Sequence, residues 1–219
     1  MTTETSSLPD LDPTLDLSFD DGALVVPDDV ADLMFRSART VSDFTDEPVT
    51  DAQLEAVHDL VKWGPTALNT TPMRLLVVRS PEARARLARH MAEGNRQRVL
   101  DAPLTLVVAA DPAFHRHLPT LLPHAPGKAE ELEPAVEARE AMARTNTLLQ
   151  AGYLILGLRA AGLASGAMGG LDAAGVDAEF FAASGWRTLL VLNVGHARGE
   201  GTHRPRAPRL GWGTVSAAV

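Results

Sequence analysis

The sequence contains no cysteine, and this excludes several kinds of functional site. Without thiols the chain cannot form disulfides, ligate an iron-sulfur cluster, build a thiolate zinc site or supply a thiol nucleophile. Nothing in the composition therefore supports an oxidising, secreted environment. We expect the protein to be cytoplasmic.

Positive charge is also scarce. The chain has 20 Lys and Arg against 28 Asp and Glu, which gives a formal net charge of -8 and a pI near 5.3. Binding to nucleic acid relies on clustered cationic charge, so we expect no nucleic-acid partner. A local basic pocket is still compatible with this balance.

No apolar run is long enough for a membrane span. The longest, residues 148–158, includes Gln150 and is followed directly by Arg159, so it falls short of the roughly 20 residues required. It is typical of a buried helix, and we expect no membrane partner. The acidic residues 1–26 have neither a basic start nor a continuous apolar stretch, so they indicate a mobile or surface-draped arm rather than a signal peptide.

The length of 219 residues and the 45% hydrophobic content support a substantial core in one large or two small domains. A capping box at Thr50 and Gln53 opens one helix, which stops at Gly64-Pro65. The elements do not alternate as regular βαβ units, which indicates an α+β or mixed α/β domain. The patterns predict helices over 27–35, 50–63, 81–93, 135–161 and 172–182, and strands over 75–78, 105–110 and 187–194.

Three segments between these elements have irregular composition. Residues 112–134 carry five prolines and three histidines, which favours a surface excursion of the kind that forms lids. His115, His117 and His124 could ligate a metal, but alternate histidines in such a loop are more often solvated, so we expect no metal site. Ser165 to Leu171 is predicted to be a glycine-rich turn, and 199–219 an extended basic tail.

Several common catalytic motifs are missing. The chain has no G-x-S-x-G elbow, Walker loop or H-E-x-x-H, and GLASGAMGG lacks the dinucleotide-binding spacing. What is present is a scattered set of candidate anion-binding and close-approach positions, each of which alone could be a solvated helix end or a turn. Together they suit a flavin, whose phosphate needs arginines and a hydroxyl, whose ring needs amide donors and whose face needs uncovered backbone. The positions are Arg36 to Arg39, Asn69, Asn95, Arg98, Gly169, Gly170 and Arg206 to Arg209.

With these positions in this order along the chain, the sequence resembles the FMN-dependent nitroreductase superfamily. The resemblance is strongest to its malonic semialdehyde reductase or 3-hydroxypropionate dehydrogenase-like branch. The resemblance covers roughly residues 30 to 211 and includes FRSART, KWGPTALNTTPMR, GNRQRVLDAPLTLVVAAD, GYLILGLRAAGL, LNVGH and RAPRL. It implies an α+β fold with a mixed, mainly antiparallel sheet flanked by helices, formed by a single domain over 27–219. It also implies an intertwined homodimer with two FMN sites at the interface.

The resemblance assigns the phosphate end of the flavin to both ends of the domain. Arg36, Ser37 and Arg39 match the first phosphate contacts of the family, and Arg209 in the tail matches the residue that closes the same phosphate. We therefore expect arginines that are far apart in the sequence to converge on one mononucleotide.

The rest of the cofactor is assigned to two other stretches. Pro65, Thr66 and Asn69 match the loop that approaches the ring or ribityl chain from the partner subunit. Asn95 matches the family's asparagine at the ribityl and pyrimidine side, and Arg98 stands where lysine is more usual. The polar stretch between two regular elements is thus expected to be a cofactor wall.

The glycine turn carries the clearest departures from the family pattern. Gly169 and Gly170 match the turn that lies against the flavin ring, but Gly169 and Leu171 replace the branch's usual Ser and Phe. Ala167 replaces a common Pro, and Phe35 stands where many members have an arginine. These changes bear on substrate preference more than on phosphate binding.

The implied activity is that of an FMN-dependent NAD(P)H oxidoreductase acting by ping-pong hydride transfer. NADH or NADPH would reduce the flavin, which would then reduce a small carbonyl such as malonic semialdehyde, a quinone or a nitro compound. No dedicated catalytic side chain is expected, because the flavin N5 carries the chemistry. The alternatives are a flavin-dependent tailoring oxidoreductase of a natural-product pathway, a non-catalytic flavin-binding protein, and an α/β domain without flavin.

Overall fold

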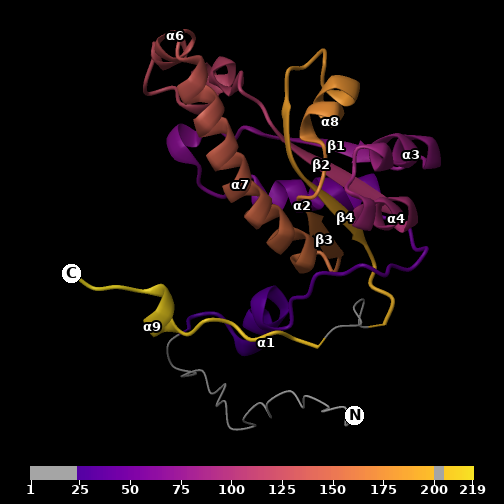
Figure 1. The fold of residues 1–219 in the computed structure, drawn as a ribbon. Helices are drawn as coiled ribbons and strands as arrows, with labels where there is room; N and C mark the ends of the chain where they lie inside the picture. The colour runs from indigo at the N-terminus through magenta and orange to yellow at the C-terminus, as the bar shows by residue number, and fades with distance from the viewer. Residues whose placement is uncertain (1–23, 200–204) are drawn as a thin grey trace, which may run out of the picture.

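The structure is a computed structural model that describes residues 24–199 and 205–219. The predicted N-terminal arm lies outside these residues except for positions 24–26, which are exposed. The described residues contain one four-stranded antiparallel sheet in the order β1-β2-β4-β3 (Figure 1). The strands are β1 (Met73–Val78), β2 (Leu104–Ala110), β3 (Ala164–Met168) and β4 (Arg187–Gly195).

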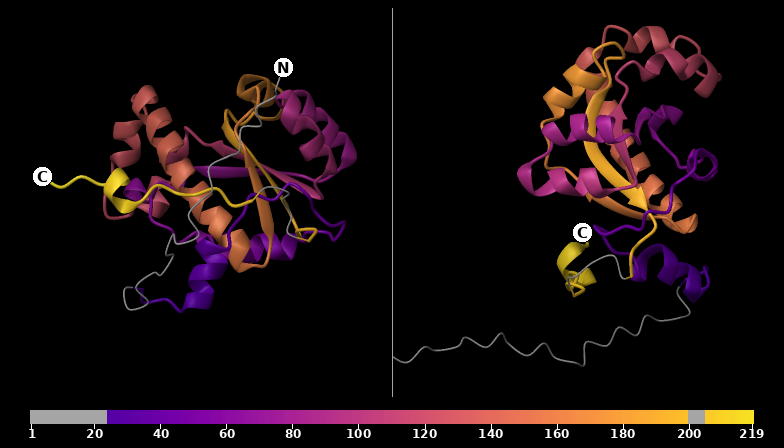
Figure 2. Two further views of the ribbon diagram at one scale, coloured as in Figure 1. Left: turned by 60° about the horizontal axis from the view of Figure 1, so that its bottom comes forward. Right: turned by 90° about the vertical axis from the view of Figure 1, so that its right-hand side faces the viewer.

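Helices cover both faces of this sheet, and the long α7 crosses one of them (Figure 2). None of the helices in the described part of the chain combines the length and apolar character needed to cross a bilayer. The helical segments are α1 (Asp28–Ala31), the π-helical η1 (Asp32–Arg36), α2 (Asp51–Val61), η2 (Ala67–Asn69), α3 (Pro81–Arg89), α4 (Glu93–Asp101), η3 (Phe114–His117), α5 (Leu118–Leu121), α6 (Lys128–Leu132), α7 (Val136–Ala160), α8 (Ala173–Phe180) and α9 (Trp212–Val215).

The core is organised around β2, every residue of which is buried. Its side chains alternate between two faces, as the pleat of a strand requires. Leu104, Leu106 and Val108 belong to the cluster that includes residues of α2 and α7. Val107 and Ala109 belong to the cluster formed with α3, α4 and α8. The prediction of a central strand over 105–110 is therefore confirmed.

Local signals in the sequence located several elements well. The capping box is present, because Gln53 N donates to Thr50 Oγ1 over 3.1 Å and Thr50 N donates to Gln53 Oε1 over 2.8 Å. The helix predicted over 135–161 is observed as α7, and the helix predicted over 27–35 is observed as α1 and η1. The helix predicted over 27–35 therefore ends in a π-helical turn rather than an α-helical one.

The single helix predicted over 81–93 is wrong. The chain forms α3 up to Arg89 and starts a second helix, α4, at Glu93. Between them Met91 is 2% exposed and forms an isolated antiparallel bridge with Leu171. Burying this side chain and pairing its backbone turn the chain, so one continuous helix is not possible here.

The glycine-rich turn predicted over 165–171 is also wrong for most of its length. Residues 164–168 form the strand β3, paired with β4. Gly166 allows the segment before α2 to approach this strand, since a Cβ there would lie 2.3 Å from the carbonyl oxygen of Val41. Only the positions after Met168, which include Gly169 and Gly170, lie outside the strand.

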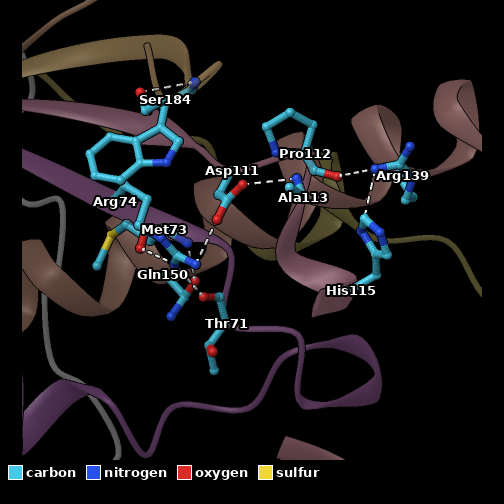
Figure 3. A network of polar contacts seen from close by, with 11 residues as sticks. Thr71, Met73, Arg74, Asp111, Pro112, Ala113, His115, Arg139, Gln150 and Ser184 are labelled. Atoms are coloured by element: carbon cyan, nitrogen blue, oxygen red, sulfur yellow. Dashed lines mark hydrogen bonds and ion pairs between the residues drawn. The ribbon is translucent and has the colours of Figure 1, made fainter. Parts of the chain in front are cut away.

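Residues 112–134 do not form the core-free surface excursion that was predicted. They contain η3, α5 and α6, and Phe114, His115 and Leu118 are 0%, 1% and 2% exposed. The solvated interpretation of His115 is therefore wrong. Its Nε2 contacts the Glu133 carboxylate. Its Nδ1 lies 3.3 Å from Nη1 of Arg139, as Figure 3 shows. This segment is a small packed subcore whose role as a lid stays a prediction.

Candidate functional site

A cavity of about 370 Å³ is lined by arginines from distant parts of the chain. Arg39 precedes α2, Arg159 lies in the last turn of α7, and Arg206 and Arg209 belong to the C-terminal tail. Among the described residues that line it are four arginines and no carboxylate, and we call it the arginine cavity. The structure thus brings Arg39 and Arg209 to one site, where their guanidinium groups suit an anion such as a phosphate.

The tail is held against the start of the domain at this cavity. Arg206 Nη2 donates to the carbonyl oxygen of Ala38 over 3.1 Å, and Figure 1 shows the tail running past α1. A side chain of the tail therefore contacts the backbone of the segment that carries Arg39. This contact explains how two ends of the domain can form one site.

One side of the edge strand β3 forms the remaining wall. Ser165 and Ala167 line the arginine cavity, whereas Met168 points into the core on the opposite side. Ala167 and the following Gly169 are exposed, so the strand presents small residues on its open side. Four residue steps along a strand span about 13 Å, which gives an uncovered strip leading from the arginine cavity to the glycine turn.

Asn95 and Gly170 meet at the far end of this strip. Asn95 Nδ2 donates to the carbonyl oxygen of Gly170 over 3.1 Å, and a Cβ at Gly170 would lie 2.9 Å from the same nitrogen. A side chain at this position would therefore displace the amide of Asn95 from its present place. Arg98 lies one turn further along α4, where its carbonyl oxygen accepts a hydrogen bond from Asn193 Nδ2 over 2.7 Å.

The structure does not bring every predicted phosphate contact to the cavity lining. Arg36 Nη1 donates to carboxylate oxygens of Asp28 and Asp32 over 2.8 and 3.0 Å, and these hydrogen bonds raise the pKa of Arg36. Ser37 Oγ donates to the carbonyl oxygen of Asp32 over 2.6 Å. Both side chains are thus engaged within the first helical segment, and their role at a phosphate stays a prediction.

Arg159 lines the same cavity and was missed as a site residue. Its Nε donates to the carbonyl oxygen of Leu33 over 2.6 Å, and its Nη2 donates to Ser37 Oγ over 3.2 Å. Burial lowers the pKa of Arg159, and the nearby charge of Arg206 lowers it further. The sequence carried a signal, because a lone arginine closes an otherwise apolar helix end.

A second cavity, of about 620 Å³, lies beside the polar loop between α2 and β1. We call it the junction cavity; Pro65, Asn69 and Thr71 are among its lining residues, and Thr66 is not. Leu68, Asn69 and Thr71 have φ values of 53°, 52° and 37°. Left-handed backbone is costly for residues other than glycine, above all for a β-branched one, and such strain gathers at functional sites.

Two buried polar side chains of α7 hold this strained loop. Asn146 Oδ1 accepts a hydrogen bond from Ala67 N over 2.7 Å, and Gln150 Oε1 accepts one from Met73 N over 2.9 Å. These residues were not predicted as site residues. Their four-residue spacing on a helix places them on one face, and this polar pair inside an apolar helix was the available signal.

An ion pair joins the loop to the buried subcore. Arg74 Nη2 lies 2.7 Å from Asp111 Oδ2, and Asp111 Oδ1 accepts a hydrogen bond from Ala113 N over 2.8 Å (Figure 3). Arg74 Nη1 also donates to the carbonyl oxygen of Thr71 over 3.1 Å. A lining residue of the junction cavity is therefore tied through Asp111 to the start of residues 112–134.

Gly64 is expected to be intolerant of any side chain. A Cβ there would lie 2.3 Å from the ring of Tyr153, whose hydroxyl donates to the carbonyl oxygen of Pro65 over 3.1 Å. Gly64→Ala should lower the free energy of unfolding by about 1–3 kcal/mol, because the ring must move. Chemical denaturation would measure this, with Gly94→Ala as control, since a Cβ at Gly94 meets nothing within 4 Å. Equal stability of the two variants would contradict the prediction.

Comparison with known families agrees with this architecture. The sequence profile of the nitroreductase family matches residues 35–196, which include the segment before α2, the whole sheet and all of α7. The chain belongs to the nitroreductase family. A Streptomyces griseus relative, provisionally named NADH dehydrogenase/NAD(P)H nitroreductase, is 49% identical over 197 residues, covering 90% of this chain and 100% of the relative.

Solved nitroreductase structures share the fold. A provisionally named nitroreductase from Bacillus subtilis aligns with a TM-score of 0.75 at 19% identity, covering 88% of this chain and 99% of that one. Another from Exiguobacterium sibiricum, solved in complex with FMN, aligns with a TM-score of 0.73 at 18% identity, covering 87% and 97%. The predicted nitroreductase-like α+β fold is therefore confirmed. Its sheet was predicted to be mixed and mainly antiparallel, and all strand pairs in the described residues are antiparallel.

Proposed function

We propose that this nitroreductase is an FMN-dependent NAD(P)H oxidoreductase. The observation that carries the proposal is the convergence of Arg39 and Arg209 on one cavity, next to a strip of small residues on the open side of β3. The names of relatives support the same activity, since they refer to NAD(P)H nitroreductases, and one structural neighbour was solved with FMN.

The described residues fit a flavin mononucleotide. The arginine cavity offers charge-assisted donors for a phosphate dianion, and the open side of β3 leaves room for a flat ring. We propose that Arg39 and Arg209 bind the phosphate, with Arg36 and Ser37 as the further contacts that the resemblance implies. Asn95, Arg98, Gly169 and Gly170 would border the ring and ribityl chain.

When bound, FMN would accept hydride from NADH or NADPH and pass electrons to a second substrate. The protein would bind and orient both reactants, and we propose no side chain as a proton donor. Arg98 at the pyrimidine side would favour negative charge on the ring. The substrate class is a small carbonyl such as malonic semialdehyde, a quinone or a nitro compound.

We propose that the enzyme is a homodimer. Large apolar side chains are exposed on the single chain, among them Trp63 and Trp212 at 80% each and Leu148 and Leu149 on α7 at 42% and 48%. Clusters of exposed apolar side chains on soluble proteins commonly mark protein interfaces. In this arrangement the junction loop, with Pro65, Thr66 and Asn69, would face the partner's flavin.

The absorbance spectrum of the purified protein tests the proposal directly. We expect a yellow protein with flavin bands, from which heat releases FMN. Anaerobic addition of NADH or NADPH should then bleach the flavin band, and a substrate panel should restore it. A protein that neither carries nor takes up FMN would contradict the proposal, and bound flavin that never bleaches would indicate a flavin-binding protein without turnover.

A further inference from the structure

We infer that Arg159 is a phosphate-binding residue of the arginine cavity. The inference rests on the proposed function, and it concerns a residue outside the set that the resemblance supplied. The ligand class is a phosphate monoester, with flavin mononucleotide as the instance tested. Arg159 would contribute a guanidinium from the core helix α7, beside those of Arg39 and Arg209.

The side chain is already oriented for such a contact. Nε and Nη2 of Arg159 are fixed by the carbonyl oxygen of Leu33 and the hydroxyl of Ser37, at 2.6 and 3.2 Å. Within residues 24–199 and 205–219, Nη1 of this arginine has no hydrogen-bond partner. A guanidinium held by two of its nitrogens loses little rotamer freedom when the third binds an anion, which favours affinity.

Arg36 occupies a different position, although the resemblance makes it a phosphate contact. Its Nη1 is shared between the carboxylates of Asp28 and Asp32, and it does not line the arginine cavity. Recruiting Arg36 to the phosphate would require these two ion pairs to break or rearrange. Arg159 needs no such change, because its anchors are neutral oxygens.

The charges around the cavity also favour an anion. The positive charges of Arg159 and Arg206 repel each other. Because Arg159 is half-buried, this repulsion is screened less than it would be in bulk water. None of the described residues that line the cavity is a carboxylate that could balance Arg159 and Arg206. A dianion placed among the arginines would replace repulsion with attraction, and its stabilisation would fall as salt is added.

Paired flavin titrations can test this inference, because riboflavin differs from FMN only in lacking the phosphate. The dissociation constants of both are measured with the full-length protein, and their ratio reports phosphate recognition apart from ring binding. For Arg159→Met we expect the preference for FMN to fall about tenfold or more, with riboflavin affinity little changed. Arg144→Met is the matched control, because it removes the same charge from the same helix. Arg144 is exposed and lies about 22 Å from Arg159 toward the N-terminus of α7.

Two more variants keep the test decisive. Arg159→Lys retains the charge and should recover part of the FMN preference, and it replaces the Met variant if that one fails to fold. Arg36→Met should reduce the preference less than Arg159→Met does. If both Arg159 variants keep the wild-type preference for FMN, the inference is wrong while the proposed function stands. Wild-type protein that binds neither flavin would overturn the proposed function, and the inference with it.

Discussion

Protein carrying Arg39→Ala and Arg209→Ala together should bind FMN about 10²- to 10⁴-fold more weakly than wild type. Each substitution removes a charge-assisted contact, which contributes about 1.5–3 kcal/mol, and every 1.4 kcal/mol is tenfold in affinity. The two residues come from opposite ends of the domain but line one cavity, so their losses should act on the same phosphate.

Quenching of flavin fluorescence would measure the dissociation constants. Arg89→Ala is the control, because Arg89 is exposed on α3 and is not part of the arginine cavity. Each single variant should lie between wild type and the double variant. The assignment of this cavity to the phosphate would be wrong if the double variant retained wild-type affinity while still folding.

The elements that the sequence predicted well are those whose causes are local. The capping box at Thr50 needs only residues three positions apart, and the largely apolar run of β2 needs only its own composition. The strand β3 was missed because ASGAM has little intrinsic strand preference. Its conformation comes from pairing with β4, and strand preference depends strongly on such context.

The same distinction applies to the candidate site. The resemblance, and not the local pattern, indicated that Arg39 and Arg209 belong together, and the structure brings both to the arginine cavity. The only local mark of Arg159 was its position at the end of an apolar helix, since its importance comes from contacts with residues more than a hundred positions earlier. Arg36 shows the reverse, because its nearby acids Asp28 and Asp32 compete for the charge that the family pattern assigns to a ligand.

Residues 112–134 show how composition alone can mislead. Five prolines and three histidines are typical of a surface loop, yet Phe114 is fully buried and packs edge-on with His115 at a ring separation of 6.2 Å. The prolines are compatible with short helices, as at the start of α5. The cluster around Phe114 includes residues of α5, α6 and α7, so this segment shares its stability with the main helix of the fold.

Phe114→Ala should therefore lower the free energy of unfolding of the whole protein by about 3–5 kcal/mol, the usual cost of emptying a buried phenyl site. In a chain of this size that corresponds to a fall in Tm of about 10 °C, measurable by thermal denaturation. Phe35→Ala is the matched control, because the same atoms are removed from a side chain that is 63% exposed, and its Tm should stay close to wild type.

If residues 112–134 instead open as an independent lid, Phe114→Ala would leave Tm unchanged and speed amide hydrogen exchange in that segment alone. A global fall in Tm would show that any lid motion has to take place around a fixed Phe114, because its packing against the α7 cluster is part of the cooperative core.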